Sequence, residues 1–308
     1  MVNCNLKEYI LTTYTLENQH LKAVITPYGA RLHQLWVATD QGWINVVQHC
    51  QKIEDYASDP WYKGAVIGPV AGRLRQPIVV SGKTIAVDET DKPLLHSGSL
   101  GWSHQEWTLH SQSKEELIFS LTAEQTTNSF PGKVKTHVSY RLLEATLCLE
   151  YHAESSMPTP INMTNHSYFN LAPSHTFQKH RLQLNAKQRL EMDSQQLPTG
   201  KILENKSAEY NFLKEKEIGV VTLDDYFLIP DSGAVGSLFH PAHGIRMDIS
   251  SNQNGVVVFT PASFPAICFE TEAPPDALYH SHFENILYTP ERPYHQKVHF
   301  DFRCCIIE

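Results

Sequence analysis

Residues 162–171, NMTNHSYFNL, place His166 in the middle of a stretch rich in hydrogen-bonding side chains. At the two-residue period of a β-strand, His166 shares one face with polar residues only. Each unpaired group in a buried polar row costs about 1–3 kcal/mol, so we expect this face to border a wet cleft. There His166 can exchange a proton with a ligand, because imidazole titrates near neutral pH. The alternative is a solvated strand in which His166 has no role.

Residues 266–272, AICFETE, contain a second group suited to proton transfer. In a strand, Cys268, Glu270 and Glu272 share one face while the intervening residues pack on the other. Apolar neighbours desolvate the carboxylate of Glu270 and raise its pKa toward the range of a useful general base. The alternative is a carboxylate exposed to water at the end of a strand.

Arg73 follows several glycines in residues 64–75, GAVIGPVAGRLR. These glycines do not form a phosphate-binding loop, because no GK[ST] and no helix follows them. The guanidinium is a permanent cation whose fork of donors suits hydroxyl or carboxylate groups. The alternative is a surface arginine paired with a neighbouring acid.

His96 precedes a loop rich in glycine and serine that contains Trp102 and Trp107. These tryptophans can stack on the flat apolar face of a sugar, or they can fill the core. Asp224 and Asp225 are adjacent in residues 222–229, and in an extended chain they point to opposite faces. We therefore expect only one of them to enter a given cleft.

Two further patterns argue against a metal site. Residues 280–284, HSHFE, have an HxHxE spacing, but they lack the remote ligand and flanking glycines of a cupin-type site. The six cysteines are scattered without a CxxC pair. This favours neither a zinc site nor a disulfide framework, and we expect reduced thiols.

The composition is that of a soluble globular protein, with 41% hydrophobic and 19% charged residues among 308. The net charge of −8 argues against a nucleic-acid partner, which would require clustered lysine and arginine, and a neutral small molecule fits better. No window approaches the roughly 20 apolar residues that span a bilayer, so we expect no membrane partner and a cytoplasmic location. The sequence does not indicate an oligomeric state.

Short alternating or β-branched runs recur along the whole chain and long amphipathic helical patterns are nearly absent, which predicts an all-β protein. A sandwich or barrel is favoured over βαβ units. Without repeats or linkers, we expect one domain over residues 1–308. One helical turn is expected at 53–59. The expected strands are 20–26, 31–38, 116–124, 133–142, 146–154, 180–187, 244–251, 255–261, 266–272 and 297–307.

These segments together resemble the aldose 1-epimerase, or galactose mutarotase, family over about residues 26–289. The matching pieces, in the order of the family, are TPYGARL, YKGAVIGPVAGRL, LLHSGSLGW, FPGKVKTHVSY, PTPINMTNHSYFNLA, LPTGKI, LDDYFLI and CFETEAPPDA. The resemblance implies a single large β-sandwich of the galactose mutarotase-like supersandwich type. It also implies an isomerase that interconverts the α and β anomers of a free hexose without a cofactor.

The resemblance further assigns roles to individual residues. Glu270 is similar to the general base of the family and His166 to its general acid, while His96, Arg73 and Asp224 are similar to its sugar contacts. We expect an ionised Glu270 and a charged His166 on opposite sides of the sugar. One removes the proton of the anomeric hydroxyl while the other protonates the ring oxygen, which needs no metal or nicotinamide.

Several positions depart from the family pattern. Gly72 stands in place of an asparagine, Asp225 in place of a histidine, and Glu272 in place of a glutamine, which affects the expected sugar specificity. A hexose phosphate would need a second cation near Arg73, from Lys63 or Arg75.

Two other functions remain open on the sequence alone. A glycoside hydrolase would use two carboxylates, and Glu270 and Glu272 would lie about 6.6 Å apart along a strand, but on one side of the scissile bond. A sugar-binding sandwich without catalysis would not need both Glu270 and His166.

Overall fold

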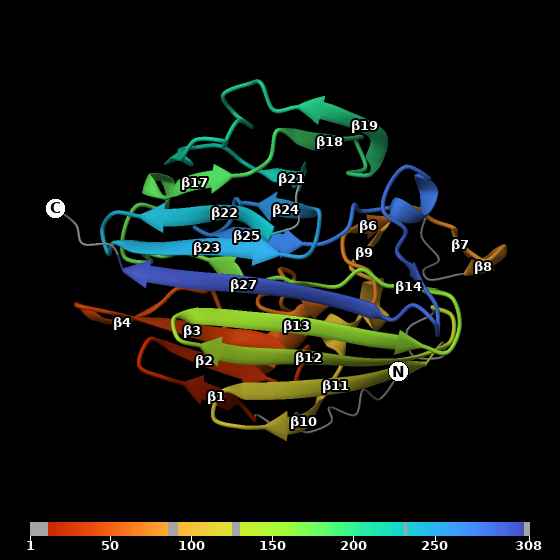
Figure 1. Cartoon of the computed structure of the whole chain (residues 1–308), viewed down its shortest axis with the longest axis horizontal. Helices are drawn as coiled ribbons and strands as arrows, with labels where there is room; N and C mark the ends of the chain where they lie inside the picture. Colours follow the sequence, from red (N-terminus) through yellow and green to blue (C-terminus); the bar gives the residue numbers. More distant parts are fainter. Residues whose placement is uncertain (1–11, 86–91, 125–129, 231–232, 305–308) are drawn as a thin grey trace, which may run out of the picture.

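A nine-stranded antiparallel sheet is the largest element of the computed structural model, which describes residues 12–85, 92–124, 130–230 and 233–304 (Figure 1). In spatial order its strands are β10 (Thr108–Gln112), β11 (Glu116–Glu124), β12 (Lys133–Leu143), β13 (Thr146–Ser155), β27 (Tyr294–Cys304), β23 (Ile245–Ser251), β22 (Gly233–His240), β17 (Arg181–Leu184) and β20 (Lys216–Glu217). The long central strands alternate between buried and exposed residues, with Val134, Val138 and Tyr140 of β12 pointing inward. This alternation is what fixes one face of the sheet to the core.

Two smaller sheets lie behind the nine-stranded sheet in Figure 1 and complete the sandwich. The six-stranded sheet has the order β16 (Tyr168–Phe169), β25 (Ile267–Thr271), β24 (Gly255–Phe259), β21 (Asp224–Leu228), β18 (Gln188–Met192) and β19 (Pro198–Glu204). The four-stranded sheet consists of β1 (Tyr14–Glu17), β2 (Leu21–Thr26), β3 (Arg31–Thr39) and β4 (Gly42–Asn45). One continuous core joins the three sheets, including Leu35, Leu149, Val258, Phe269 and Phe300. The predicted all-β class is confirmed.

Short elements connect the sheets and carry much of the polar chemistry. The remaining strands form the pairs β5 (Val66–Ile67) with β15 (Thr164–Asn165), β6 (Arg73–Leu74) with β9 (Leu94–Leu95), β7 (Ile78–Val80) with β8 (Lys83–Ile85), and β14 (Thr159–Pro160) with β26 (Leu287–Tyr288). The 3-10 helices are η1 (Ile53–Ser58), η2 (Gly98–Leu100), η3 (Trp102–His104), η4 (Phe177–Lys179) and η5 (Ala277–Tyr279). The helical turn expected at 53–59 is η1.

The expected single strand over residues 162–171 is wrong, because the segment is broken into β15 and β16 with His166 between them. Its asparagines face no wet cleft; they are buried and use their amides on the backbone of other segments. Asn162 donates to the carbonyl of Ala273 at 3.0 Å and accepts from its N–H at 2.9 Å. Asn165 donates to the carbonyl of Gly64 at 3.0 Å. Satisfied amide side chains therefore replace strand pairing around His166.

The expectations about cysteines, membrane spans and domains concern the whole chain. Cys50, Cys148, Cys268 and Cys304 are free thiols, while Cys4 and Cys305 lie outside the described residues. None of the helices in the described ranges is sufficiently long and apolar to cross a membrane. A single domain over residues 1–308 stays a prediction.

Candidate active site

A cavity of about 160 Å³ lies where the six-stranded sheet meets the short strands β6 and β9. All five residues that the sequence singled out line it: Arg73, His96, His166, Asp224 and Glu270. They come from separate parts of the chain, since Arg73 begins β6, His96 follows β9, Asp224 begins β21 and Glu270 lies in β25. The fold thus brings the five residues together at one cavity.

His166 and Glu270 form a close pair on one wall of the cavity. Nε2 of His166 lies 3.5 Å from Oε1 of Glu270, and both side chains are about 95% buried, with 6% and 5% exposed. The other ring nitrogen of His166, Nδ1, lies 3.5 Å from the thiol sulfur of Cys268. The expectation that acid and base occupy opposite sides of a sugar is wrong for this cavity, because no pyranose ring fits into 3.5 Å.

Burial sets the protonation of this pair. It raises the pKa of Glu270 to about 8, helped by the negative charge of Asp224 and opposed by Arg73. It lowers the pKa of His166 to about 4. The expected ionised glutamate and charged histidine are therefore not the favoured state of the free cavity. Between these two pKa values the pair holds one proton, which resides mainly on Glu270 and faces a neutral imidazole.

His96 is fixed in one tautomer by the backbone of Gly72. Its ring nitrogen Nδ1 accepts the backbone N–H of Gly72 at 3.2 Å. The backbone N–H of His96 donates to the carbonyl of Gly72 at 2.9 Å. Burial lowers the pKa of His96 well below the ordinary value, so the ring is neutral. The hydrogen is then on Nε2, and His96 is a hydrogen-bond donor toward a ligand. Its ring centre lies 5.2 Å from that of His166.

Asp224 and Arg73 provide opposite charges on the remaining wall. Burial raises the pKa of Asp224, and the Arg73 guanidinium opposes that rise. Asp225 also lines the cavity, so the expectation that only one of the two aspartates would enter it is wrong. The Oδ1 atom of Asp225 lies 3.4 Å from Nε of Arg189, so the guanidinium of Arg189 compensates the charge of this carboxylate.

The aromatic wall of the cavity was not identified from the sequence. It includes Trp61, Tyr62, Tyr168 and Phe259. Trp61 stacks on Phe259 with ring centres 6.4 Å apart. Trp102 and Trp107, which the sequence offered as stacking residues, are instead buried in the core. The only available signal was that Trp61 and Tyr62 come directly before a glycine-rich segment.

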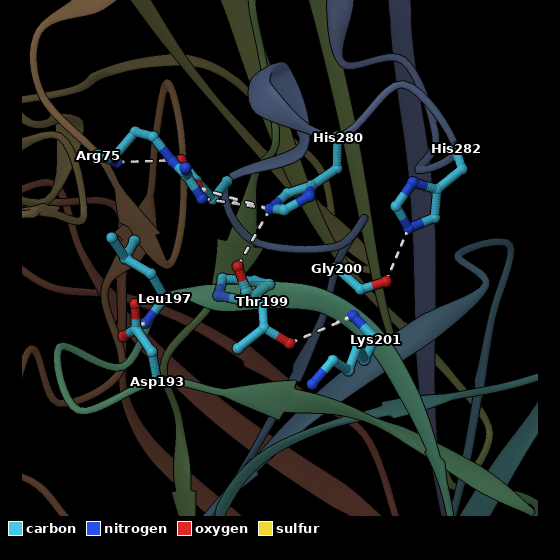
Figure 2. Close-up of polar contacts among 10 residues, drawn as sticks. Arg75, Asp193, Leu197, Thr199, Gly200, Lys201, His280 and His282 are labelled. Carbon is cyan, nitrogen blue, oxygen red and sulfur yellow. Dashed lines mark hydrogen bonds and ion pairs between the residues drawn. The ribbon is translucent and has the colours of Figure 1, made fainter.

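The turn between β18 and β19 completes the rim of the cavity with Met192 and Gln196. Figure 2 shows its support: the Asp193 carboxylate accepts the N–H of Leu197 at 3.0 Å. His280 and His282, from the HSHFE segment, reach β19 from the other side. Their Nε2 atoms lie 3.1 and 2.9 Å from the carbonyl oxygens of Pro198 and Gly200. These histidines support β19 by contacting its backbone.

Within the described ranges, one group of histidine, cysteine and carboxylate atoms is already close enough together to hold a metal ion without any side chain moving, and it is His96, His166 and Glu270. Their ligating atoms all lie within 4.8 Å of one another. All three groups are buried and have shifted pKa values. Such groups in a cavity are typical of acid–base sites, so the three residues are candidates for proton transfer.

Comparison with known proteins identifies the family. Residues 12–301 match the family described as Aldose 1-epimerase. The chain belongs to the aldose 1-epimerase family. Galactose mutarotase of Bos taurus is 28% identical over 319 residues, which cover 94% of this chain and 93% of that protein. Maltose epimerase of Levilactobacillus brevis is 23% identical over 327 residues, which cover 96% of each chain.

A solved structure agrees with this aldose 1-epimerase family fold. The crystal structure of the GalM/aldose epimerase homologue from C. elegans superposes with a TM-score of 0.90 at 22% identity. The superposition covers 96% of this chain and 100% of that one. The predicted mutarotase-like sandwich is confirmed, and the chain is an isomerase of the aldose 1-epimerase family that acts on a small sugar.

Glu272 is unusual for a cavity residue in this aldose 1-epimerase family member. It has no exposed surface, and neither of its carboxylate oxygens has a hydrogen-bond partner in the described part of the chain. Gly72, with φ +72°, leaves room for it, since a Cβ there would lie 3.3 Å from Oε1 of Glu272. Burial raises the pKa of Glu272 well above its ordinary value, and the charge of Glu270 adds to this rise.

We expect Glu272→Gln to make stability less dependent on pH. In the wild type the unfolded carboxyl loses its proton above its ordinary pKa while the folded one keeps it, so the free energy of unfolding falls as pH rises. The fall is at most about 1.4 kcal/mol per pH unit, and it ends where the folded group ionises. Urea unfolding at pH 5.5, 6.5 and 7.5 measures how the free energy of unfolding changes with pH in each protein. The same change with pH in Glu272→Gln and in the exposed control Glu54→Gln would contradict this prediction.

Proposed function

We propose that this chain interconverts the α and β anomers of a free hexose by opening and reclosing the sugar ring, with Glu270 and His166 transferring the protons. The observation that carries the proposal is the 3.5 Å pair of His166 and Glu270 in a buried cavity of about 160 Å³. That volume suits a single monosaccharide. A pair that shares one proton is what simultaneous proton removal and delivery require.

The adjacent placement of the two groups suits the substrate. Ring opening removes a proton from the anomeric hydroxyl and adds one to the ring oxygen, and both oxygens are bonded to C1. Glu270 takes the proton of the hydroxyl as the base and His166 protonates the ring oxygen as the acid. The resulting aldehyde rotates about the C1–C2 bond, and reclosure runs the same transfers in reverse. Because each anomer returns the borrowed proton, the pair ends in its starting state.

The bound sugar shifts the pair toward the reactive state. In the free cavity the proton lies mainly on Glu270, so the charged form of the pair is a minor one. An ionised Glu270 and a charged His166 only 3.5 Å apart attract each other strongly, because both side chains are buried. Hydroxyl groups that donate to Glu270 stabilise this form further.

Three further residues hold the hexose in our proposal. His96 donates from Nε2 to a sugar oxygen, since its Nδ1 is occupied by Gly72. Arg73 donates from its guanidinium, and the half-buried carboxylate of Asp224 accepts from ring hydroxyls. The aromatic wall at Trp61 and Tyr168 covers the apolar C–H face of the ring.

A phosphorylated sugar is disfavoured by the charges near Arg73. Nζ of Lys63 is held by Asp59 at 2.8 Å, and Nε of Arg75 is held by Asp276 at 2.6 Å. Neither of these two cations is among the described residues that line the cavity. Neither Lys63 nor Arg75 is thus placed to meet a phosphate group beside Arg73. The cytoplasmic location expected from the sequence stays a prediction.

The two other functions considered fit the cavity less well. The carboxylate pair considered for a glycoside hydrolase, Glu270 and Glu272, does not suit that reaction, because Glu272 has no exposed surface with which to contact substrate or water. A binding protein without catalysis has no use for a buried acid–base pair, whose desolvation costs stability.

Polarimetry tests the proposed reaction directly. With freshly dissolved α-D-galactose and α-D-glucose, we expect the protein to speed the approach to the equilibrium rotation far beyond the spontaneous rate. Relaxation at the spontaneous rate for both sugars would refute the proposal for these hexoses. Release of reducing sugar from aryl glycosides would point to the hydrolase instead.

A further inference from the structure

The outer face of the nine-stranded sheet carries a row of histidines remote from the sugar cavity. His137 of β12 is directly opposite His152 of β13, and His152 is directly opposite His295 of β27. His110 joins the row from the edge strand β10, with its ring centre 5.1 Å from that of His137. A groove of about 440 Å³ runs along this face and is lined by all four histidines.

The backbone directs the four rings to this place. His110 sits at the bulge where the register of β10 against β11 shifts between Leu109 and Ser111. Between His110 and His137, strand β11 presents the small side chain of Ser120, which is opposite His137 in the register. The bulge and the small residue together let His110 approach His137 across an intervening strand.

The ring nitrogens of His110, His137 and His152 are unused within the part of the chain that the structure describes, because none has a hydrogen-bond partner there. Burial and the neighbouring rings of His110 and His152 lower the pKa of His137. A neutral imidazole with a free nitrogen is the form that binds metal ions. Three free imidazoles in one groove therefore have the right chemistry for a transition metal.

We propose that His110, His137 and His152 together bind one divalent transition-metal ion of the zinc, nickel or copper class. A metal–nitrogen bond of about 2.0–2.1 Å places two imidazole centres on one tetrahedral ion about 5 Å apart. The observed spacing of His110 and His137 is 5.1 Å. Directly opposed residues on neighbouring strands have Cβ atoms about 4.5–5.5 Å apart, so His152 reaches the same ion after rotation of its side chain.

Glu150 supports the site from its edge. Its Oε1 lies 2.5 Å from Nε2 of His295, and it also pairs with Lys297 at 3.2 Å. The carboxylate offsets part of the charge of the bound ion, and its contact with Nε2 of His295 keeps that nitrogen out of the set of ligands. The ion would join β10, at the edge of the sheet, to β12 and β13, so its binding stabilises the folded chain.

Calorimetric titration with Zn²⁺ tests the site on the full chain without a histidine tag, after treatment with a chelator. We expect one strongly bound equivalent in the wild type, and binding weakened by about ten-fold or more in His137→Ala and in His152→Ala. The matched control is His299→Ala, which removes an outward histidine of the same sheet at another register position. It should bind zinc as the wild type does.

The cavity group of His96, His166 and Glu270 is the competing site, and His166→Asn distinguishes it. Zinc binding that survives in His166→Asn and is lost in His137→Ala supports the surface site. Binding that is lost in His166→Asn but unchanged in both surface variants would overturn the proposal, as would no binding in the wild type. Unchanged polarimetric activity and urea unfolding of the metal-free surface variants show that they fold.

Discussion

Replacing Glu270 by glutamine should lower the rate of anomer interconversion by about 10²–10⁴-fold, the usual contribution of a general base. Glutamine has the size of the glutamate but accepts no proton, so binding of the sugar should change little and the loss should fall on kcat. Polarimetry over a range of galactose concentrations separates kcat from KM. Glu272→Gln, two residues along the chain, is the matched control and should retain activity. A Glu270→Gln protein within ten-fold of wild-type kcat would contradict the assigned base.

The pH dependence of the wild-type reaction provides a second readout for the same variant. The pair is active with one proton, so kcat/KM should be flat between limbs near pH 4 and pH 8, set by His166 and Glu270. Activity falls below the lower limb when the pair gains a second proton, and above the upper limb when it loses its last one. The residual activity of Glu270→Gln should lack the upper limb.

His166→Asn should also reduce kcat by about 10²–10⁴-fold, because the ring oxygen then leaves without a proton donor. Asparagine keeps a polar group at this buried position and avoids the cavity that alanine would leave. Measured by polarimetry, the variant should lose the lower limb of its pH profile.

The control for His166→Asn is His104→Asn. His104 is half-buried and its ring lies 5.6 Å from that of Tyr62, but it does not line the cavity. Its replacement should leave kcat within a few-fold of wild type. Equal losses in both variants would mean that packing around Tyr62, and not proton transfer, explains the effect. Wild-type activity in His166→Asn would remove His166 from the mechanism.

The large sheet could be predicted from the sequence because its strands alternate regularly. The expected strand 116–124 coincides with β11, and the expected strands 133–142 and 146–154 match β12 and β13 to within one residue at their C-terminal ends. Each of these strands has one face on the core and one face in water, which imposes the two-residue period. The alternation of residue types in the sequence and the alternation of burial in the structure both follow from having one face of the sheet on the core.

The region around the cavity could not be predicted in this way, because side chains fix it instead of strand pairing. Residues 162–171 are buried on all sides, so their sequence has no exposed face to reveal a period. Asn162 and Asn165 bond to backbone atoms 111 and 101 positions away in sequence, at Ala273 and Gly64. Such partners are invisible in a local pattern.

The five candidate residues were singled out by their chemistry and received their roles from the family resemblance, and the structure adds their arrangement. No local pattern could show that His166 and Glu270 are adjacent, or that Asp225 also lines the cavity. Desolvation by distant segments also sets the pKa of both members of the pair, and it favours the neutral forms that the sequence did not predict.

The double hydrogen bond between Asn162 and Ala273 has a mechanical consequence. Asn162 precedes His166 by four residues and Ala273 follows Glu270 by three, so this amide links the two segments that carry the acid and the base. On the other side of the two residues, β16 pairs with β25 through Tyr168 and Cys268. The segments of His166 and Glu270 are therefore held together at both ends, which restrains the distance between the two side chains.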